Sequence, residues 1–365
     1  MEPFKNELSF ANVAQLARVI EEASDEFSRE IFFEGLEREL EALELKGRVR
    51  CVAERIESAI SVQPPRLFEI LREALVRDTT LQGFVLWPFT EVVARRGLDH
   101  FEESMNALRA MTPRYTAEFA VRPFLLKHES RTFRRLHEWC DDPNEHVRRL
   151  VSEGSRPLLP WGMRLPSLMV KPELGLALLE RLYDDPSEYV RLSVSNHLND
   201  FSKAHPELVL DTLKRWRSGG SISRELDKLS RHASRTLLKQ GNPDALSLHG
   251  YADADSFELQ EFRLENSDVR VGEKLRYLLV IRNRSDREQK LLFDYAIHHR
   301  KANGSLSPKV FKGRVRVLAS GEEITIEGAH SFREVTTRRY YSGGHRFEPQ
   351  INGRAWPAVD FGLLV

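Results

Sequence analysis

Residues 141–156 read DDPNEHVRRLVSEGSR and residues 184–200 read DDPSEYVRLSVSNHLND, and the two stretches share the pattern DDPxExVRxxVS at an offset of 43 residues. Helical repeats of the HEAT and armadillo type recur every ~40–47 residues. Such repeats stack so that each one packs only on its neighbours. The offset therefore predicts an all-α solenoid of HEAT-like repeats.

The repeated Asp-Pro pair predicts where a helix of each repeat begins. Asp142 and Asp185 suit the N-cap, the proline that follows suits the first helical position, and the glutamate further on falls where a capping box closes. Thr112-Pro113 carries the same signal one repeat earlier. We therefore expect at least three stacked helical pairs.

The spacing of apolar residues changes once along the chain. From about residue 9 to 240, apolar residues three and four apart are interrupted by proline turns, which predicts many short helices. Residues 241–255, GNPDALSLHGYADAD, have the composition of a linker. The alternating runs beyond it predict a small antiparallel sandwich of the immunoglobulin-like class. We expect a multidomain chain, with the solenoid over residues 1–245 and the sandwich over residues 256–365.

Charge is balanced over the chain and uneven along it. Lys plus Arg and Asp plus Glu are both 55, whereas residues 109–164 carry 11 basic and 7 acidic side chains. A local basic stripe points weakly to phosphate binding, and solvated helix faces produce the same count. The distribution alone leaves both interpretations open.

The cysteines and the apolar runs indicate the cellular compartment in which the protein is expected to function. Cys51 and Cys140 have no CxxC spacing, which argues against a disulfide framework or a thiolate metal site. No stretch approaches the ~18 apolar residues of a membrane span, and the N-terminus has no apolar leader. We expect a cytoplasmic protein that has no membrane-spanning segment and binds no metal ion.

The helix expected from Pro143 has two distinct faces. Val147, Leu150 and Gly154 fall on a packing face, while Arg149 and Glu153 fall on the other, which we expect to be free. Arg114, Glu118 and Arg122, spaced by four, predict one ridge on the preceding repeat. With Asp200 on the following repeat, three successive repeats would each present a carboxylate on one wall.

Ordinary explanations compete with a functional one at these positions. Ion pairs at i,i+4 can simply lie on the solvated face of a helix, where each pair stabilises the helix by ~0.2–0.5 kcal/mol. Asn196 and Asn199 are harder to explain as decoration, because Asn is a mediocre helix former. Trp161, after Pro157 and Pro160, is either a buried anchor between helices or an aromatic side chain at the mouth of a groove, able to stack on a base or face a cation.

Several segments resemble a known family. FAVRPFLLKH (119–128), SEGSRPLLPWG (152–162) and NHLND (196–200) are similar to the AlkC branch of the HEAT-like DNA alkylation repair glycosylases. The resemblance covers most of residues 1–240. Members of that branch also carry an immunoglobulin-like C-terminal domain, which suits residues 256–365.

The resemblance implies a monofunctional glycosylase that excises cationic N3-alkylated bases, such as 3-methyladenine and 3-methylcytosine, from double-stranded DNA without full base extrusion. Nothing in the sequence demands a dimer, so we expect a monomer, and we expect a reaction that requires no metal or organic cofactor. Glu118, Trp161 and Asp200 match the family's active-site positions. Basic residues matching its DNA groove are Arg148, Arg149 and Arg156, and we add Arg122 and Asn196 as DNA-binding candidates.

The chemistry of such a substrate fits these residues. A base alkylated at a ring nitrogen is cationic and already a good leaving group, so the enzyme need not protonate it. It needs anions near the developing oxocarbenium sugar, a carboxylate for the water and an aromatic face for the cation. Glu118 and Asp200 can supply the first two, and Trp161 the third.

The sandwich offers its own basic candidates. Arg314, Arg316, Arg338 and Arg339 either sit on ordinary outward strand faces or form a clamp that closes over DNA from the side opposite the solenoid. His298 and His299 are adjacent, so they would point to opposite faces of a strand and would not share a metal.

Two other functions use the same architecture. A HEAT-repeat scaffold would bind a protein partner through its concave face, and a DNA-binding protein could keep the basic wall without catalysis. The scaffold predicts no dependence on Glu118 or Asp200 beyond modest effects on stability.

Overall fold

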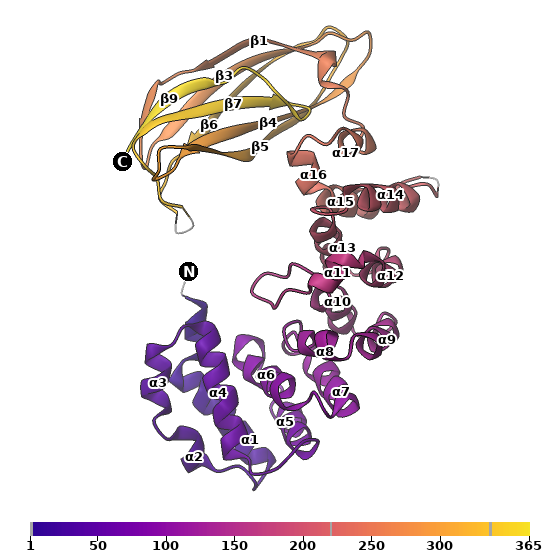
Figure 1. The fold of residues 1–365 in the computed structure, drawn as a ribbon, viewed down its shortest axis with the longest axis vertical. Coiled ribbons are helices and arrows are strands. Elements are labelled where there is room, and N and C mark those ends of the chain that lie inside the picture. The colour runs from indigo at the N-terminus through magenta and orange to yellow at the C-terminus, as the bar shows by residue number, and fades with distance from the viewer. Residues whose placement is uncertain (1–2, 220, 336–337) are drawn as a thin grey trace. The chain divides into compact units, whose positions relative to one another are not determined.

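A computed structural model of the chain describes residues 3–219, 221–335 and 338–365. Its internal contacts divide the chain into two compact units, Met1–Ala204 with Ser223–Ala233, and His205–Ile222 with Ser234–Val365. Helices make up the first unit, and in its described residues the second combines three α-helices and one short 3-10 helix with the strands (Figure 1). In the described part of the chain, no helix combines the length and the apolar character that crossing a membrane requires.

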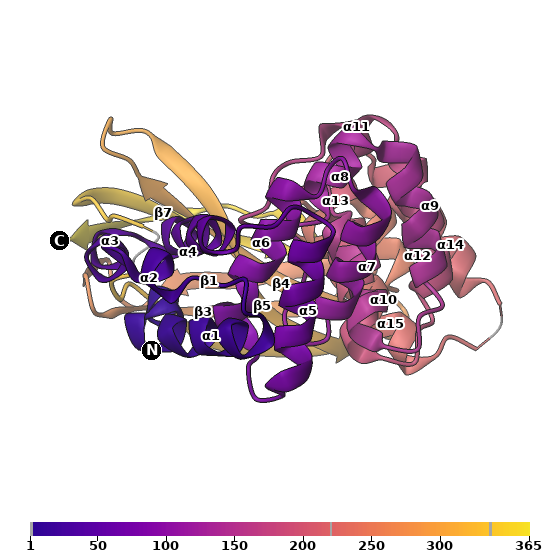
Figure 2. The same ribbon diagram turned by 90° about the horizontal axis from the view of Figure 1, so that it is seen from below.

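The helices of the first unit stack in two layers. One layer holds α4, α6, α10, α13 and α15, and the other holds α1, α5, α7, α9 and α12 (Figures 1 and 2). Contacts join α4 to α6 and α13 to both α10 and α15 in the first layer, and α5 to both α1 and α7 and α9 to α12 in the second. The all-α solenoid is therefore confirmed. Its elements are η1 (Phe4–Leu8), α1 (Phe10–Ala23), α2 (Arg29–Phe33), α3 (Leu36–Ala42), α4 (Leu45–Ala59), α5 (Arg66–Arg77), η2 (Gly83–Leu86), α6 (Trp87–Arg96), α7 (Phe101–Met111), α8 (Arg122–Lys127), α9 (Glu129–Trp139), α10 (Glu145–Gly154), α11 (Pro166–Val170), α12 (Pro172–Leu182), α13 (Glu188–Phe201) and α15 (Arg224–Ala233).

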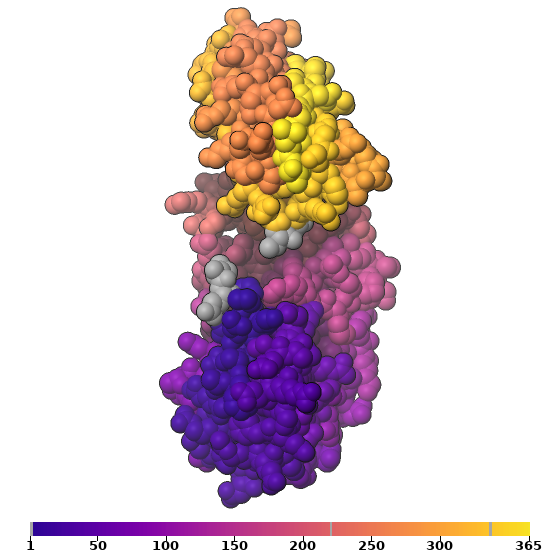
Figure 3. All heavy atoms as spheres, turned by 90° about the vertical axis from the view of Figure 1, so that its left-hand side faces the viewer, coloured from indigo at the N-terminus to yellow at the C-terminus, as the bar shows by residue number. Residues whose placement is uncertain are grey.

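Apolar stripes on these helices form the core. The amphipathic α5 buries its leucines and Phe68, and α1 buries Val13, Leu16 and Ile20 against it. In the space-filling view the N-terminal helices form one densely packed body (Figure 3). The spacing of three and four read from the sequence therefore marks the buried faces correctly.

The Asp-Pro pairs lie just outside the helices that they were expected to begin. α10 starts at Glu145 and α13 at Glu188, two residues later than predicted. The Asp142 carboxylate accepts a hydrogen bond from the Asn144 N–H (2.9 Å), and the Asp185 carboxylate accepts one from the Ser187 N–H (2.8 Å). The aspartates thus close turns before the helices instead of capping them, a local competition typical of Asp.

Arginines tie each repeat to the next through these aspartates. Nε and Nη2 of Arg148 donate to the Asp185 carboxylate at 2.7 and 3.0 Å, and Nη1 donates to the Asp142 carbonyl oxygen at 2.8 Å. Arg109 Nε donates to the Asp142 carboxylate in the same way, at 2.5 Å. Arg148, assigned to a DNA groove by the resemblance, is therefore committed to a tie between repeats.

The ridge of Arg114, Glu118 and Arg122 does not form. Thr112 ends α7, with its hydroxyl donating to the Leu108 carbonyl oxygen (2.6 Å), so Thr112-Pro113 closes a helix where it was predicted to open one. Turns fill the chain up to Val121, and α8 begins only at Arg122. Arg114 donates to the Leu81 carbonyl oxygen (3.2 Å), in a different place from Glu118.

Two sheets form the sandwich of the second unit. The three-stranded sheet has the order β1-β3-β6, and the larger sheet has the order β2-β9-β7-β4-β5 with β8 paired to β7. Tyr295 and Phe347 stack in the core with ring centroids 4.7 Å apart. The strands are β1 (Phe257–Leu264), β2 (Asp268–Arg270), β3 (Lys274–Asn283), β4 (Gln289–Arg300), β5 (Leu306–Leu318), β6 (Glu323–Ser331), β7 (Gly343–Ile351), β8 (Arg354–Ala355) and β9 (Val359–Leu364).

The segment predicted as a linker is folded and packs against the sandwich. It contains α17 (Pro243–Leu248), which follows α14 (Pro206–Arg217) and α16 (Arg235–Lys239), and η3 (Ala254–Ser256) begins before it ends. Gly241 lies so close to Gly353 that an added Cβ would stand 2.4 Å from its carbonyl oxygen. The Asn352 side-chain amide donates to the Ala252 carbonyl oxygen (2.8 Å). The Gly, Asn and Pro residues here serve close packing, so the composition of a linker was misleading.

We predict that Arg148→Ala lowers the free energy of unfolding by roughly 3 kcal/mol, because Asp185 would remain buried without its partner. Chemical denaturation of the folded protein measures the change. Arg18→Ala is the control, since the Arg18–Glu22 pair is exposed and surface pairs contribute ~0–1 kcal/mol. Unchanged stability of Arg148→Ala combined with weakened DNA binding would support the original assignment of Arg148 to a DNA groove.

Candidate active site

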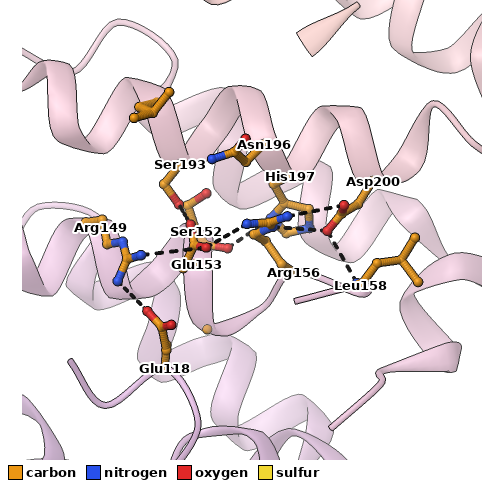
Figure 4. A network of polar contacts seen from close by, with 12 residues as sticks. Glu118, Arg149, Ser152, Glu153, Arg156, Leu158, Ser193, Asn196, His197 and Asp200 are labelled. Carbon is orange, nitrogen blue, oxygen red and sulfur yellow. Dashed lines mark hydrogen bonds and ion pairs between the residues drawn. The ribbon is translucent and has the colours of Figure 1, made fainter. Parts of the chain in front are cut away.

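Five charged side chains of alternating sign form one connected series, Glu118–Arg149–Glu153–Arg156–Asp200, called here the charge chain (Figure 4). Arg149 contacts Glu118 at one end and lies 3.6 Å from Glu153. Arg156 donates to Glu153 at 2.6 Å, and to the two carboxylate oxygens of Asp200 at 3.0 and 3.3 Å. The carboxylates of three successive repeats are thus brought together.

The charge chain is buried, contrary to the prediction of a free polar face. Glu153 is 5% exposed and Asp200 is 2% exposed, because α13 packs directly on α10. Burial acts to lower the pKa of Arg156, but its bonds and charge interactions with Asp200 and Glu153 outweigh burial and raise it. Buried charges persist only when they are paired, and here each has a partner of opposite sign.

A turn and a glycine place Glu118. Its carboxylate Oε2 accepts a hydrogen bond from the Thr116 hydroxyl (3.0 Å), and the Glu118 N–H donates to the same hydroxyl oxygen (3.3 Å). At Gly154 an added Cβ would stand 2.6 Å from a methyl group of Val121, so only glycine lets this turn approach α10. The pattern of apolar residues assigned Gly154 to the packing face correctly.

Arg122 has no exposed surface and anchors a loop. Its guanidinium donates to the Gly154 carbonyl oxygen (2.8 Å) and to the Met163 carbonyl oxygen (2.6 Å from Nε). Burial lowers the pKa of Arg122 to about 10, so it remains charged at neutral pH. A guanidinium enclosed in this way holds the loop that carries Trp161 and cannot contact a DNA phosphate in this structure.

Trp161 is exposed and sits in a backbone conformation that is rare for a tryptophan. Its φ is 63°, and 54% of the residue is accessible, which excludes a buried anchor between helices. Lys46 Nζ donates to its carbonyl oxygen (2.5 Å), and its ring meets Phe4 edge to face at 6.2 Å. Non-glycine residues held at positive φ concentrate at functional sites.

Polar side chains of α13 support the charge chain. The Ser193 hydroxyl donates to Glu153 Oε2 (2.6 Å), and His197 Nδ1 lies 3.0 Å from the Ser152 carbonyl oxygen. Asn196, predicted to bind DNA, has its side-chain oxygen 2.9 Å from His232 Nε2. Asn196 is therefore already part of a contact between α13 and α15.

Two cations in this part of the solenoid were not predicted from the sequence as DNA-binding candidates. Arg164 is exposed three residues after Trp161, with no hydrogen bond or ion pair to any described residue. Lys203 Nζ lies 3.7 Å from Asp200, with its side chain 46% exposed. Arg164 is the basic residue of the PWGMR segment, so the Pro-rich loop that singled out Trp161 also held the signal for it.

The sandwich arginines fall in two groups. Arg314 and Arg316 lie on the edge strand β5, whereas Arg338, which contacts His299, and Arg339 follow β6. His299 is buried in the sandwich, while His298 lies 3.3 Å from Glu348. Within the described ranges, no group of His, Cys, Asp and Glu side chains is arranged to hold a metal ion.

The solenoid, the buried charge chain and the exposed Trp161 define a helical-repeat protein with a carboxylate site. A family model described as "Uncharacterised protein YhaZ, C-terminal Ig-like domain" matches residues 258–365. The Bacillus subtilis protein YhaZ, itself uncharacterized, is 38% identical over 350 residues, covering 96% of each chain. The solved structure of Pseudomonas fluorescens alkylpurine DNA glycosylase AlkC, bound to DNA containing an abasic site analog, is 33% identical, with a TM-score of 0.94 over 100% of both chains.

The chain belongs to the family of AlkC and YhaZ. The resemblance carried by SEGSRPLLPWG and NHLND is therefore confirmed, and so is the immunoglobulin-like class of the sandwich.

We predict that His197 makes the protein less stable in acid. Burial lowers the pKa of His197 to about 3 from 6.5, so only the unfolded chain takes up this proton as pH falls between those values. Stability should therefore fall over that window, by about 2 kcal/mol for this group between pH 7.5 and 5. Urea unfolding at both pH values should show a smaller loss for His197→Gln than for the wild type. His146→Gln, at an exposed histidine, is the control and should leave the loss unchanged.

Proposed function

We propose that the chain is a monofunctional DNA glycosylase that removes cationic N3-alkylated bases, 3-methyladenine and 3-methylcytosine, from double-stranded DNA. The observation that carries the proposal is the placement of Glu118 and Asp200 at the two ends of the charge chain, in the solenoid that also exposes Trp161. The likeness to AlkC, described as an alkylpurine DNA glycosylase, supports it.

The reaction suits carboxylates and needs no acid. As the bond between the sugar C1′ and the base nitrogen breaks, its electron pair goes to the cationic base, which leaves neutral. Positive charge moves to the sugar as an oxocarbenium ion, which nearby carboxylates stabilise. Water then adds at C1′ and gives its proton to a carboxylate acting as general base. The products are the free base and an abasic site.

The hydrogen bonding of the two carboxylates supports different tasks for them. Both Asp200 oxygens accept from Arg156, and Oδ2 also accepts from the Leu158 N–H (3.3 Å), so both oxygens of this group are held by donors. Glu118 uses only Oε2, and its Oε1 has no partner among the described residues. We therefore assign the oriented water to Glu118 and stabilisation of the sugar cation to Asp200.

Trp161 supplies the face for the positively charged lesion. An exposed indole attracts a flat cation through its ring quadrupole and stacks on bases, by ~1–3 kcal/mol per base. Because the aromatic side chain comes to the lesion on a loop that Arg122 anchors, the base need not leave the helix completely. A neutral base offers no charge to this arrangement, which favours alkylated substrates.

We propose other residues of the solenoid for the contacts with DNA phosphates than those expected from the sequence. Arg149 and Arg156 hold the two carboxylates, and Arg122 and Arg148 bind backbone and Asp185, so these four position the site. We propose that Arg164 and Lys203 contact the DNA backbone in their place. The sandwich arginines Arg314, Arg316, Arg338 and Arg339 remain candidates for a second DNA contact.

We predict that Glu118→Gln and Asp200→Asn bind methylated duplex DNA but release bases ~10²–10³-fold more slowly than the wild type, the scale of losing one preorganised electrostatic group. Chromatography of the free bases measures release under single-turnover conditions. Glu103→Gln, at an exposed glutamate of α7, controls for loss of one negative charge and should release normally.

The outcomes separate the rival functions. Binding without release by the wild type would indicate a non-catalytic DNA-binding protein. Neither binding nor release would leave the protein–protein scaffold as the better explanation. Normal release by both carboxylate variants would refute the assigned chemistry.

We predict that Arg164→Ala weakens binding to any duplex and reduces the slope of log K against log salt by ~0.9, because one phosphate contact releases about that many counterions. Fluorescence anisotropy titrations at four salt concentrations measure the slope. An unchanged slope would remove Arg164 from the DNA-contacting surface. Arg131→Ala on α9, an exposed arginine paired with Glu102, is the matched control.

A further inference from the structure

A hollow of about 320 Å³ lies beside Trp161 within the first unit. Its lining comes from α4, from α6, from the segment around Phe119 and Pro123, and from the loop residues Trp161 to Met163. The size falls at the lower end of the ~300–1,000 Å³ typical of small-molecule sites. Trp161 belongs to this lining, and Phe119 directly follows Glu118 in the chain.

Aromatic and apolar side chains form most of the wall. Trp87 and Phe119 stack with their ring centroids 4.6 Å apart and their planes 17° from parallel. Val49, Ala94 and Met163 also line the hollow. Such a lining accepts a flat, largely apolar guest, because stacking on an aromatic face needs no particular pattern of hydrogen bonds.

One carboxylate in the lining has no partner. Glu91 makes no hydrogen bond or ion pair with any described residue, although burial raises its pKa. The nearby arginines are already paired, Arg50 with Glu54 at 3.0 Å and Arg95 with Glu57 at 2.7 Å. A half-buried carboxyl group without a partner is costly, so a guest that hydrogen-bonds to it would relieve the cost.

We propose that this hollow is a holding site for the alkylated base after its release, with Glu91 as the group that recognises it. The inference rests on the proposed function, which generates that base. Freed 3-methyladenine is flat and carries an amino N–H beside an acceptor ring nitrogen, an edge that matches a protonated carboxyl group, whose carbonyl oxygen accepts and whose O–H donates. Stacking against the aromatic wall and pairing with Glu91 would occur together.

The position of the hollow explains why it would help turnover. Trp161 is shared by the hollow and by the proposed lesion-facing site, so a base that leaves the sugar has an aromatic surface to move along. Withdrawing the base from the sugar stops it from recombining with the oxocarbenium ion. Free base in excess would occupy the hollow and slow the next turnover.

Isothermal titration of the full chain with free 3-methyladenine tests the site directly. We expect the wild type and Glu103→Ala to bind alike, and Glu91→Ala to bind about tenfold more weakly, because the edge of the base loses its hydrogen-bonding partner. Ala94→Leu, which adds bulk to the hollow, should also lose binding while thermal unfolding shows that it is folded. Absence of binding by the wild type, or equal binding by Glu91→Ala, overturns the proposal.

Base release with and without added 3-methyladenine separates this proposal from the proposed function. Added base should slow multiple-turnover release by the wild type and by Glu103→Ala, and slow Glu91→Ala about tenfold less effectively. Normal release that is insensitive to added base overturns the holding site and leaves the glycosylase assignment intact. Absence of release from the wild type overturns the proposed function, and the holding site with it.

Discussion

Pairing of buried charges within Glu118–Arg149–Glu153–Arg156–Asp200 is what allows α10, α13 and the turn before α8 to pack together. Each guanidinium bridges two carboxylates, so no charge is left alone in a region with little water. The same bonds set the positions of the two outer carboxylates. The same ion pairs therefore pack three repeats together and position the carboxylates of the proposed reaction.

Much of the fold could be predicted from the sequence. The 43-residue offset identifies the repeats, and the change from spacings of three and four to alternation identifies the sandwich. The starts of α10 and α13 were placed two residues too early, because an aspartate before a proline can close a turn as readily as it caps a helix. The prediction that a helix begins at Thr112-Pro113 was wrong for a related reason. Threonine can also end a helix, because its hydroxyl can donate a hydrogen bond to an earlier carbonyl oxygen.

Prediction of the site was less complete, for a physical reason. Periodicity separates apolar from polar faces, and it treats every polar face as solvated. Glu153 and Arg156 therefore seemed free, although partners on another repeat enclose them. Arg122 and Arg148 share a residue type with phosphate-binding arginines, but only three-dimensional contacts reveal that they bind carbonyl groups and Asp185. The family resemblance marked Glu118, Trp161 and Asp200, and the structure places all three in one unit of the solenoid.

The ties from Arg109 to Asp142 and from Arg148 to Asp185 have a consequence for how this solenoid can change in length. Each aspartate is paired with an arginine from the preceding repeat. Two repeats are therefore joined only when the first supplies the arginine and the second supplies the aspartate. A deletion that breaks this pattern out of register leaves an arginine without its aspartate, and insertion of an unrelated repeat leaves a buried aspartate without its arginine. Recombination could therefore add or remove a repeat without loss of stability only when both recombining sequences are joined at the same position of the DDPxExVRxxVS pattern.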